Sequence, residues 1–197
     1  MTKFNLTALA AACSLALSAT AFGAVTKTEY KASKDQISAK YKSEKASCKT
    51  MSGNAKDICI EEAKGHEKVA KAELEMSYKP TDRNRHDVRI AKADAAYNVA
   101  KEKCDDVTGN AKDVCVKQAK AAHIAAKADT KVAEAKVAEK VAGAPAAMRE
   151  KTAEVKKDAA ADKRDAAYAV ATEKCDAMAG DAKSNCIKDA KARFGQS

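Results

Sequence analysis

The chain has 197 residues, 46% of them apolar, but alanine supplies about half of that fraction and Trp is absent. Alanine favours helices yet offers little side-chain surface to bury, so the composition argues against a globule with a deep pocket. The formal net charge of +9 is spread along the chain among acidic residues. We therefore expect an elongated, well-solvated all-α protein, whose excess charge would attract anionic polymers or lipid headgroups.

The first 24 residues have the three parts of a secretory signal peptide, namely a short basic start, an apolar middle and a small-residue end. Ala19-Thr-Ala21 fits the small-x-small rule, which predicts cleavage near Ala21–Ala24 and export to the periplasm. Two alternatives stay open. The segment is almost long enough to be an uncleaved membrane anchor. Lipoprotein processing at Cys13 is disfavoured, because the three preceding residues, Ala10-Ala11-Ala12, lack the large aliphatic residue of a lipobox.

A cysteine pattern then occurs three times, and it organises the rest of the chain. In each copy the first Cys lies five residues before a Gly and the second lies six after it. Two residues nearly equidistant from a tight turn meet when two helices fold back antiparallel, so each copy predicts an αα-hairpin closed by its own disulfide. The predicted pairs are Cys48–Cys59, Cys104–Cys115 and Cys175–Cys186, with turn glycines Gly53, Gly109 and Gly180. An even, regular cysteine set in an exported chain favours disulfides.

Helix-breaking residues divide the chain into three hairpins of two helices each. Pro80 stops one helical run and Gly143-Ala-Pro145 stops another, which gives hairpins at 25–79, 80–142 and 143–197. The spacing leaves open whether the three hairpins pack into one bundle or form an extended array.

Three further residue types recur in the copies. Asn54 and Asn110 follow their glycines and are predicted to cap the returning helices, with Asp181 in the third copy. Tyr41, Tyr97 and Tyr168 each precede a cysteine by one heptad and are predicted to pack over the disulfide inside the hairpin. The three histidines, His66, His86 and His123, are isolated in sequence, and we expect them to face solvent.

Sequence signatures of catalysis are missing, and we expect no enzyme, cofactor or metal site. There is no Gly-rich phosphate loop, G-x-S-x-G or H-E-x-x-H. A zinc site needs about four ligands, whereas one C-x10-C supplies two. The C-x-x-C of redox proteins is absent, although a thiol-based metal or redox role stays an alternative. Without aromatic residues interleaved in a basic stripe, we expect no nucleic-acid binding.

The Glu-Lys-Cys…Gly-Asn-Ala-Lys-Asp-Val-Cys hairpins and the ending Asp-Ala-Lys-Ala-Arg-Phe-Gly (189–195) carry a resemblance. With the leading segment, the chain resembles small exported Lys/Ala-rich proteins of Gram-negative envelopes, labelled TolA-like or cell envelope biogenesis proteins. The similarity to TolA itself is limited to its long Ala/Lys/Glu helical domain. This resemblance implies an envelope location and a non-enzymatic role.

Together these features predict a periplasmic helical scaffold, spacer or interaction module. Peptidoglycan, anionic lipid and acidic envelope proteins are the partners that a basic surface would suit. A periplasmic stress chaperone that holds unfolded clients is the main alternative, and the thiol-based role is the other.

Overall fold

The computed structural model describes residues 25–140 and 145–196, and in this part it contains six α-helices, two short 3-10 turns and no strand. The α-helices are α1 (Lys27–Ser47), α2 (Gly53–Tyr78), α3 (Asp82–Lys103), α4 (Gly109–Lys140), α5 (Ala146–Cys175) and α6 (Gly180–Phe194). The 3-10 turns η1 (Cys48–Thr50) and η2 (Cys104–Asp106) follow α1 and α3. The predicted fold class, three tandem αα-hairpins, is confirmed. The predicted signal peptide and Cys13 lie outside the described residues.

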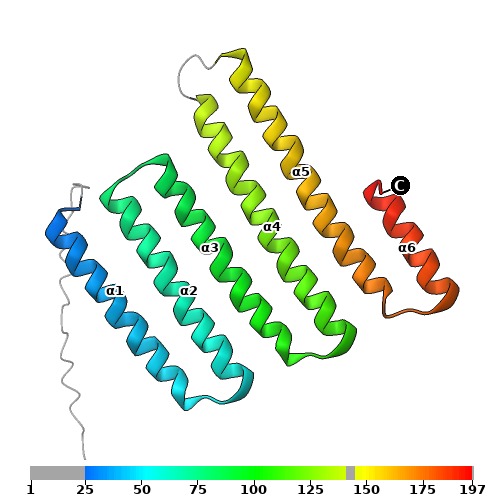
Figure 1. Cartoon of the computed structure of the whole chain (residues 1–197), viewed down its shortest axis with the longest axis horizontal. Helices are drawn as coiled ribbons and strands as arrows, with labels where there is room; N and C mark the ends of the chain where they lie inside the picture. The colour runs from blue at the N-terminus through cyan, green and yellow to red at the C-terminus, as the bar shows by residue number, and fades with distance from the viewer. Residues whose placement is uncertain (1–24, 141–144, 197) are drawn as a thin grey trace, which may run out of the picture.

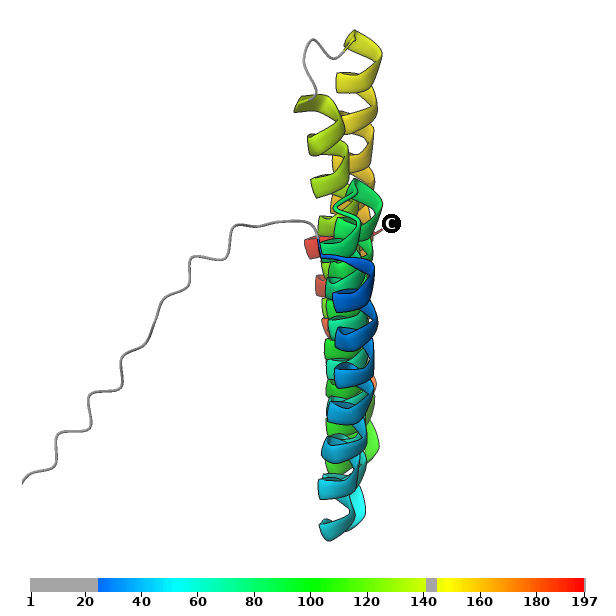
Figure 2. The ribbon, with the colours of Figure 1, turned by 90° about the vertical axis from the view of Figure 1, so that its left-hand side faces the viewer.

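The helices form one flat layer. Figure 1 shows them side by side in chain order with alternating direction, and Figure 2 shows that the layer is one helix thick. Every extensive helix–helix interface joins helices that are consecutive in the chain, from α1 with α2 to α5 with α6. The question that the sequence left open is therefore decided in favour of an extended array. Among residues 25–140 and 145–196, no helix covers either broad face of the layer.

The core consists of small side chains at the seams between helices. The buried apolar residues comprise eight alanines, one valine and three cysteines: Ala63, Ala91, Ala93, Ala119, Ala128, Ala159, Ala166, Ala190, Val88, Cys48, Cys104 and Cys175. An inner helix of the layer has a neighbour on each side, so it needs small residues on two sides. Ile90, Ala93 and Tyr97, spaced by three and four residues, share the side of α3 that faces α4, where Tyr97 stacks on His123. The second seam, toward α2, contains Ala95, and a Cβ added to Gly65 there would lie 3.0 Å from the Cβ of Ala95.

Each hairpin turns at the same edge of the layer, at the bottom of Figure 1. Gly53, Gly109 and Gly180 have φ of 56°, 60° and 57°, a left-handed conformation that is costly for residues with a Cβ. The leading helices end at or immediately before their cysteine, so the chain reverses within a few residues and brings the two cysteines together.

The predicted capping role of Asn54 is wrong. Helix α2 already begins at Gly53, and its N-cap position is Ser52, whose side chain makes no capping hydrogen bond. Asn54 therefore lies inside the first turn, and its side chain donates to the next hairpin instead. Asn110 does the same one repeat further on.

Candidate interaction surface

The six cysteines of the three hairpins are joined as the spacing predicts. The Cα–Cα separations are 5.7 Å for Cys48–Cys59, 5.5 Å for Cys104–Cys115 and 5.7 Å for Cys175–Cys186. The first cysteine of each pair is fully buried. These bridges stabilise a layer whose alanine core contributes little hydrophobic free energy.

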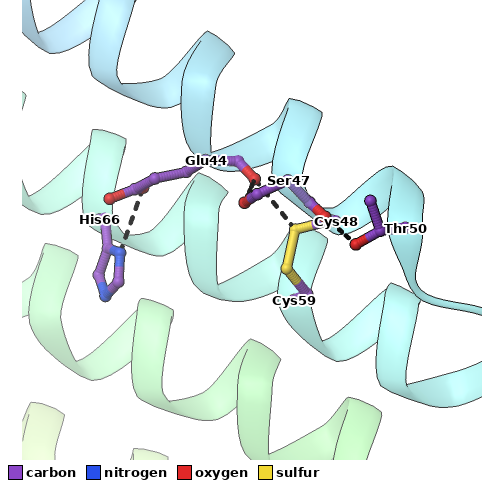
Figure 3. The surroundings of a disulfide bond; sticks show 6 residues. All are labelled: Glu44, Ser47, Cys48, Thr50, Cys59 and His66. Carbon is purple, nitrogen blue, oxygen red and sulfur yellow. Dashed lines mark hydrogen bonds and ion pairs between the residues drawn. A yellow bond between two sulfur atoms is a disulfide. The ribbon is translucent and has the colours of Figure 1, made fainter.

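Short polar contacts surround the first disulfide, as Figure 3 shows. Ser47 donates its hydroxyl to the carbonyl of Glu44 at 2.7 Å, and Thr50 donates to the carbonyl of Ser47 at 2.8 Å. The Glu44 carboxylate reaches across the seam to His66 Nδ1 at 3.3 Å. The side chains around the disulfide thus order the turn and link the two helices of the hairpin.

Tyr97 and Tyr168 contact the returning helices of their hairpins, whereas the Tyr41 ring lies near Lys45 of its own helix. Tyr97 stacks on His123 with ring centroids 4.7 Å apart, and Tyr168 meets Phe194 edge-on at 6.2 Å. His123 and Phe194 each lie eight residues beyond the returning cysteine. The contacts found are therefore about two helical turns away from the disulfide along the returning helix.

The expectation that the histidines face solvent is wrong for two of the three. The His86 and His123 side chains are only 29% and 19% exposed. Each histidine reaches a carboxylate on a neighbouring helix: His66 lies beside Glu44, His86 beside Glu134 at 3.2 Å, and His123 beside Asp94 at 2.7 Å. Sequence spacing missed these pairs because their members are distant in the chain and meet only across a seam.

Asp94 makes polar contacts across both seams of α3. It accepts a hydrogen bond from Lys68 Nζ of α2 at 2.7 Å and pairs with His123 of α4. Partial burial alone would raise the pKa of Asp94, but the hydrogen bonds from Lys68 and His123 outweigh it and hold this pKa below its ordinary value. Asp94 thus ties three helices together on one face of the layer.

The opposite face of the layer is basic. Lys103 lies nine residues after Asp94, two and a half helical turns, so the two side chains leave α3 on opposite faces. Steps of seven, eleven and fourteen residues, close to two, three and four helical turns, place further cations of α3 on the same face as Lys103, and the repeat places their equivalents in α5 there too. We call this the basic face, defined by Arg85, Arg89, Lys92, Lys103, Arg149, Lys156, Lys163 and Lys174.

Only some of these cations have an anionic neighbour. Lys92 pairs with Glu73 at 2.7 Å, and Lys103 approaches Glu62 at 3.7 Å. Arg85 pairs with Asp82, and Lys163 pairs with Asp129. The remaining four have no carboxylate within ion-pair distance in the described part of the chain: Arg89, Arg149, Lys156 and Lys174. All four are exposed, so they are available to an anionic partner.

A shallow groove of about 570 Å³ lies over the seam between α2 and α3 on the basic face. Its apolar lining comes from Gly65, Val69, Ala70, Ala95, Ala96, Val99 and Ala100. Its polar lining comes from Lys40, Glu62, His66, Glu73 and Lys103. The groove exists because Gly65 and the alanines leave the seam thinly covered.

The described residues offer little else that resembles a functional centre. Across residues 25–140 and 145–196, no three His, Cys, Asp or Glu side chains gather into a group able to hold a metal ion. None of the helices described is both long enough and apolar enough to cross a bilayer. The basic face and its groove are therefore the best candidate for a functional surface.

Comparison with known proteins does not assign the chain to a family. No protein-family model, no curated protein and no solved structure matches the chain. The function is accordingly argued from the residues of the basic face and the shape of the layer.

Proposed function

We propose that the protein is a non-enzymatic component of the bacterial cell envelope, a rigid helical scaffold that presents a basic surface to an anionic partner. The observation that carries this proposal is the set of exposed cations on one face of a one-layer array, four of which have no carboxylate nearby in the described residues. A broad flat face suits an extended partner better than a small molecule, which needs a concave site.

An oxidising compartment agrees with the three disulfides, since such bonds persist outside the reducing cytosol. The periplasm is the compartment we propose, on the strength of the signal-like segment at residues 1–24 and the resemblance to envelope proteins. Peptidoglycan, anionic lipid and acidic envelope proteins share the chemistry that would recognise the basic face, because each presents negative charge along an extended surface.

Co-sedimentation with purified sacculi and with anionic vesicles tests this function and separates the two partners. We expect binding to one of them at about 0.1 M salt and loss of binding near 1 M, where the Debye length falls to about 3 Å. The triple variant Arg89→Gln/Lys156→Gln/Lys174→Gln should bind several-fold more weakly.

A matched control removes the same charge from the other face. Lys31→Gln/Lys34→Gln/Lys42→Gln changes three exposed lysines of α1, which lie on the face that carries Asp94. It should bind sacculi or vesicles like the parent chain. Equal losses in the two triple variants would show that only net charge matters, and binding that ignores salt would refute an electrostatic surface.

The groove over the α2–α3 seam favours a second candidate function, that of a periplasmic chaperone. An apolar lining with a charged rim could cradle an unfolded segment. Near-stoichiometric protein should then suppress aggregation of a model client, and Val99→Glu in the groove should abolish this effect. Val137→Glu, at an exposed valine far along α4, is the control. A spacer would leave client aggregation unchanged.

The thiol-based alternative can be tested directly. All six cysteines of the hairpins are joined in disulfides in the structure, so thiol ligation of a metal would first require reduction. Alkylation of the natively isolated protein before reduction should label none of these six cysteines. Alkylation of any of these cysteines before reduction would instead support the metal and redox hypotheses.

A further inference from the structure

The face that carries Asp94 has a different charge distribution from the basic face. Six positions of each leading helix and one position just beyond its end, spaced by steps of three and four residues, form one stripe on this face, and the repeat places the three stripes in register. The α1 stripe consists of Lys27, Lys31, Lys34, Ser38, Lys42, Lys45 and, in η1, Lys49. The α3 stripe consists of Arg83, Asp87, Ile90, Asp94, Asn98, Lys101 and, in η2, Asp105. The α5 stripe consists of Glu154, Asp158, Ala161, Asp165, Ala169, Thr172 and the C-cap Asp176.

The charge of this stripe reverses across the layer. The α1 stripe has six lysines and no acid, the α3 stripe has two basic and three acidic residues, and the α5 stripe has four acids and no base. We call the face of the layer that carries these three stripes the polarised face. Its two ends have opposite sign, although α1 and α5 occupy equivalent places in their hairpins.

The lysines of the α1 stripe are not neutralised within their own chain. All six are exposed, and in the described part of the molecule none lies within ion-pair distance of a carboxylate. On α5, Glu154 and Asp158 are likewise exposed and without a cation at ion-pair distance among the described residues. The other two acids of the α5 stripe have cations of their own, with Arg164 3.7 Å from Asp165 and Lys183 2.9 Å from Asp176. Six unpaired lysines and two unpaired acids on one face point to a partner that carries the complementary pattern.

A second copy of this chain carries that pattern. We propose that two copies associate through their polarised faces, so that the α1 stripe of each copy lies opposite the α5 stripe of the other. This inference does not depend on the proposed function, and it leaves the basic face of each copy exposed on the outside.

The symmetry of such a dimer follows from the order of the helices. A two-fold axis parallel to the helices, placed over α3, exchanges α1 of one copy with α5 of the other and closes the assembly with two identical contacts. This axis does not move residues along the helices. Equivalent positions of the two stripes therefore come opposite one another, pairing Lys27 with Glu154 of the second copy and Lys31 with Asp158.

A two-fold axis perpendicular to the helices, within the plane of the interface, would also bring the two polarised faces together. It would place α1 of one copy over α1 of the other and bring six lysines against six lysines. Like charges in register are destabilising, so this arrangement is disfavoured. The charge pattern thus selects one of two possible symmetries.

The surface available is sufficient for a specific dimer. Five helices about 9 Å apart and about 33 Å long, the rise between the first and last residue of the shared stripe, present about 1,500 Å² per copy. A standard interface buries about 800 Å² per partner. Association would also convert one layer into two, the arrangement in which helices usually cover a common face.

Sedimentation velocity of the full chain, as isolated from its cell, tests the proposal. At about 0.1 M salt we expect the mass of a dimer and at about 1 M salt that of a monomer, because the pairs are exposed and screened. Lys27→Glu/Lys31→Glu should be monomeric at both salt concentrations, and so should Glu154→Lys/Asp158→Lys. Far-UV circular dichroism should show unchanged helicity in both variants.

Two further samples restore the opposite charges across the interface and so test the pairing itself. An equimolar mixture of the two double variants should form a heterodimer, because both contacts then join opposite charges. The chain that carries all four substitutions should dimerise with itself. A parent chain that is monomeric at about 0.1 M salt overturns the proposal, as does a dimer that survives either double reversal. Binding of the α1 lysines to anionic vesicles by a monomeric parent chain would assign the stripe to a lipid surface instead.

Discussion

The side-chain amide of Asn54 donates a hydrogen bond to the main-chain carbonyl of Glu102, 3.1 Å away and in the next hairpin. Asn110 makes the equivalent bond to the carbonyl of Glu173 at 2.9 Å. Each of these carbonyls also accepts a main-chain hydrogen bond, Glu102 from the N–H of Cys104 and Glu173 from the N–H of Asp176, so the asparagine amide adds a second donor at the end of the leading helix. The third copy has Asp181 at this position, and an ionised carboxylate cannot donate such a bond. The asparagine after the turn glycine thus joins the first hairpin to the second and the second to the third.

Asn110→Asp should weaken the joint between the second and third hairpins. The substitution removes the donor and places a carboxylate beside the carbonyl of Glu173, at the negative end of the α5 dipole. We expect a loss of about 1–2 kcal/mol in the free energy of unfolding, measured from urea titrations. Asp181→Asn is the matched control and should change stability by less than about 0.5 kcal/mol. Equal effects of the two substitutions would contradict the proposed joint.

Removal of the central disulfide should destabilise the array strongly. Cys104→Ala/Cys115→Ala opens a loop closed by residues 11 apart, and the chain-entropy model assigns such a bridge about 3 kcal/mol. The alanine core offers little to compensate for this loss. Thermal unfolding followed by circular dichroism should show a lower midpoint, whereas reducing agent should leave this variant less affected than the parent because it has one bridge fewer. An unchanged midpoint would show that the bridge adds no stability.

Gly65 sets how closely α2 and α3 approach. In Gly65→Ala the new Cβ would lie 3.0 Å from the Cβ of Ala95, so the helices must separate. The gain in helix propensity is about 1 kcal/mol, and the overpacking should cost about 1–3 kcal/mol. We expect a net loss of about 1 kcal/mol in urea unfolding.

A double-mutant cycle separates these two contributions. Ala95→Gly should destabilise the parent chain, because it lowers helix propensity. In the Gly65→Ala background it should cost distinctly less, because it also removes the crowded methyl group. Additive effects would mean that the two residues do not constrain each other.

The Asp94 contacts should make stability depend on acid pH. The pKa of Asp94 in the folded chain lies below its unfolded value of about 3.9, so its contribution is complete above that value. This contribution disappears as the pH falls from about 4 through the folded pKa. Asp94→Asn should therefore lower stability at pH 7 and flatten its decline below about pH 4. Asp87→Asn, on the same face without an ion pair in the described residues, should reproduce neither effect.

Much of the hairpin architecture could be predicted from the sequence, because its determinants are local. The spacing of Cys48, Gly53 and Cys59, repeated twice, requires only that two helices meet at a tight turn. The second seam of α3, toward α2, was harder to predict. Alanines lie on several sides of that helix, and no single periodicity marks Ala95 as the residue facing Gly65. The capping role assigned to Asn54 failed for a related reason. An asparagine after a glycine suits a local cap, and nothing near it in sequence reveals a carbonyl 48 residues away.

The sequence by itself determined the helices, the three turns and the cysteine pairs, since helix propensity, glycine conformation and short loops act within one hairpin. Only the tertiary structure decided that the hairpins lie in one layer, that the histidines pair with carboxylates across seams, and that the two faces differ in charge. These features depend on how each hairpin is rotated against the next. That rotation is set by side-chain contacts such as Gly65 with Ala95 and Asn54 with Glu102, whose partners are distant in the chain and unmarked by any local pattern.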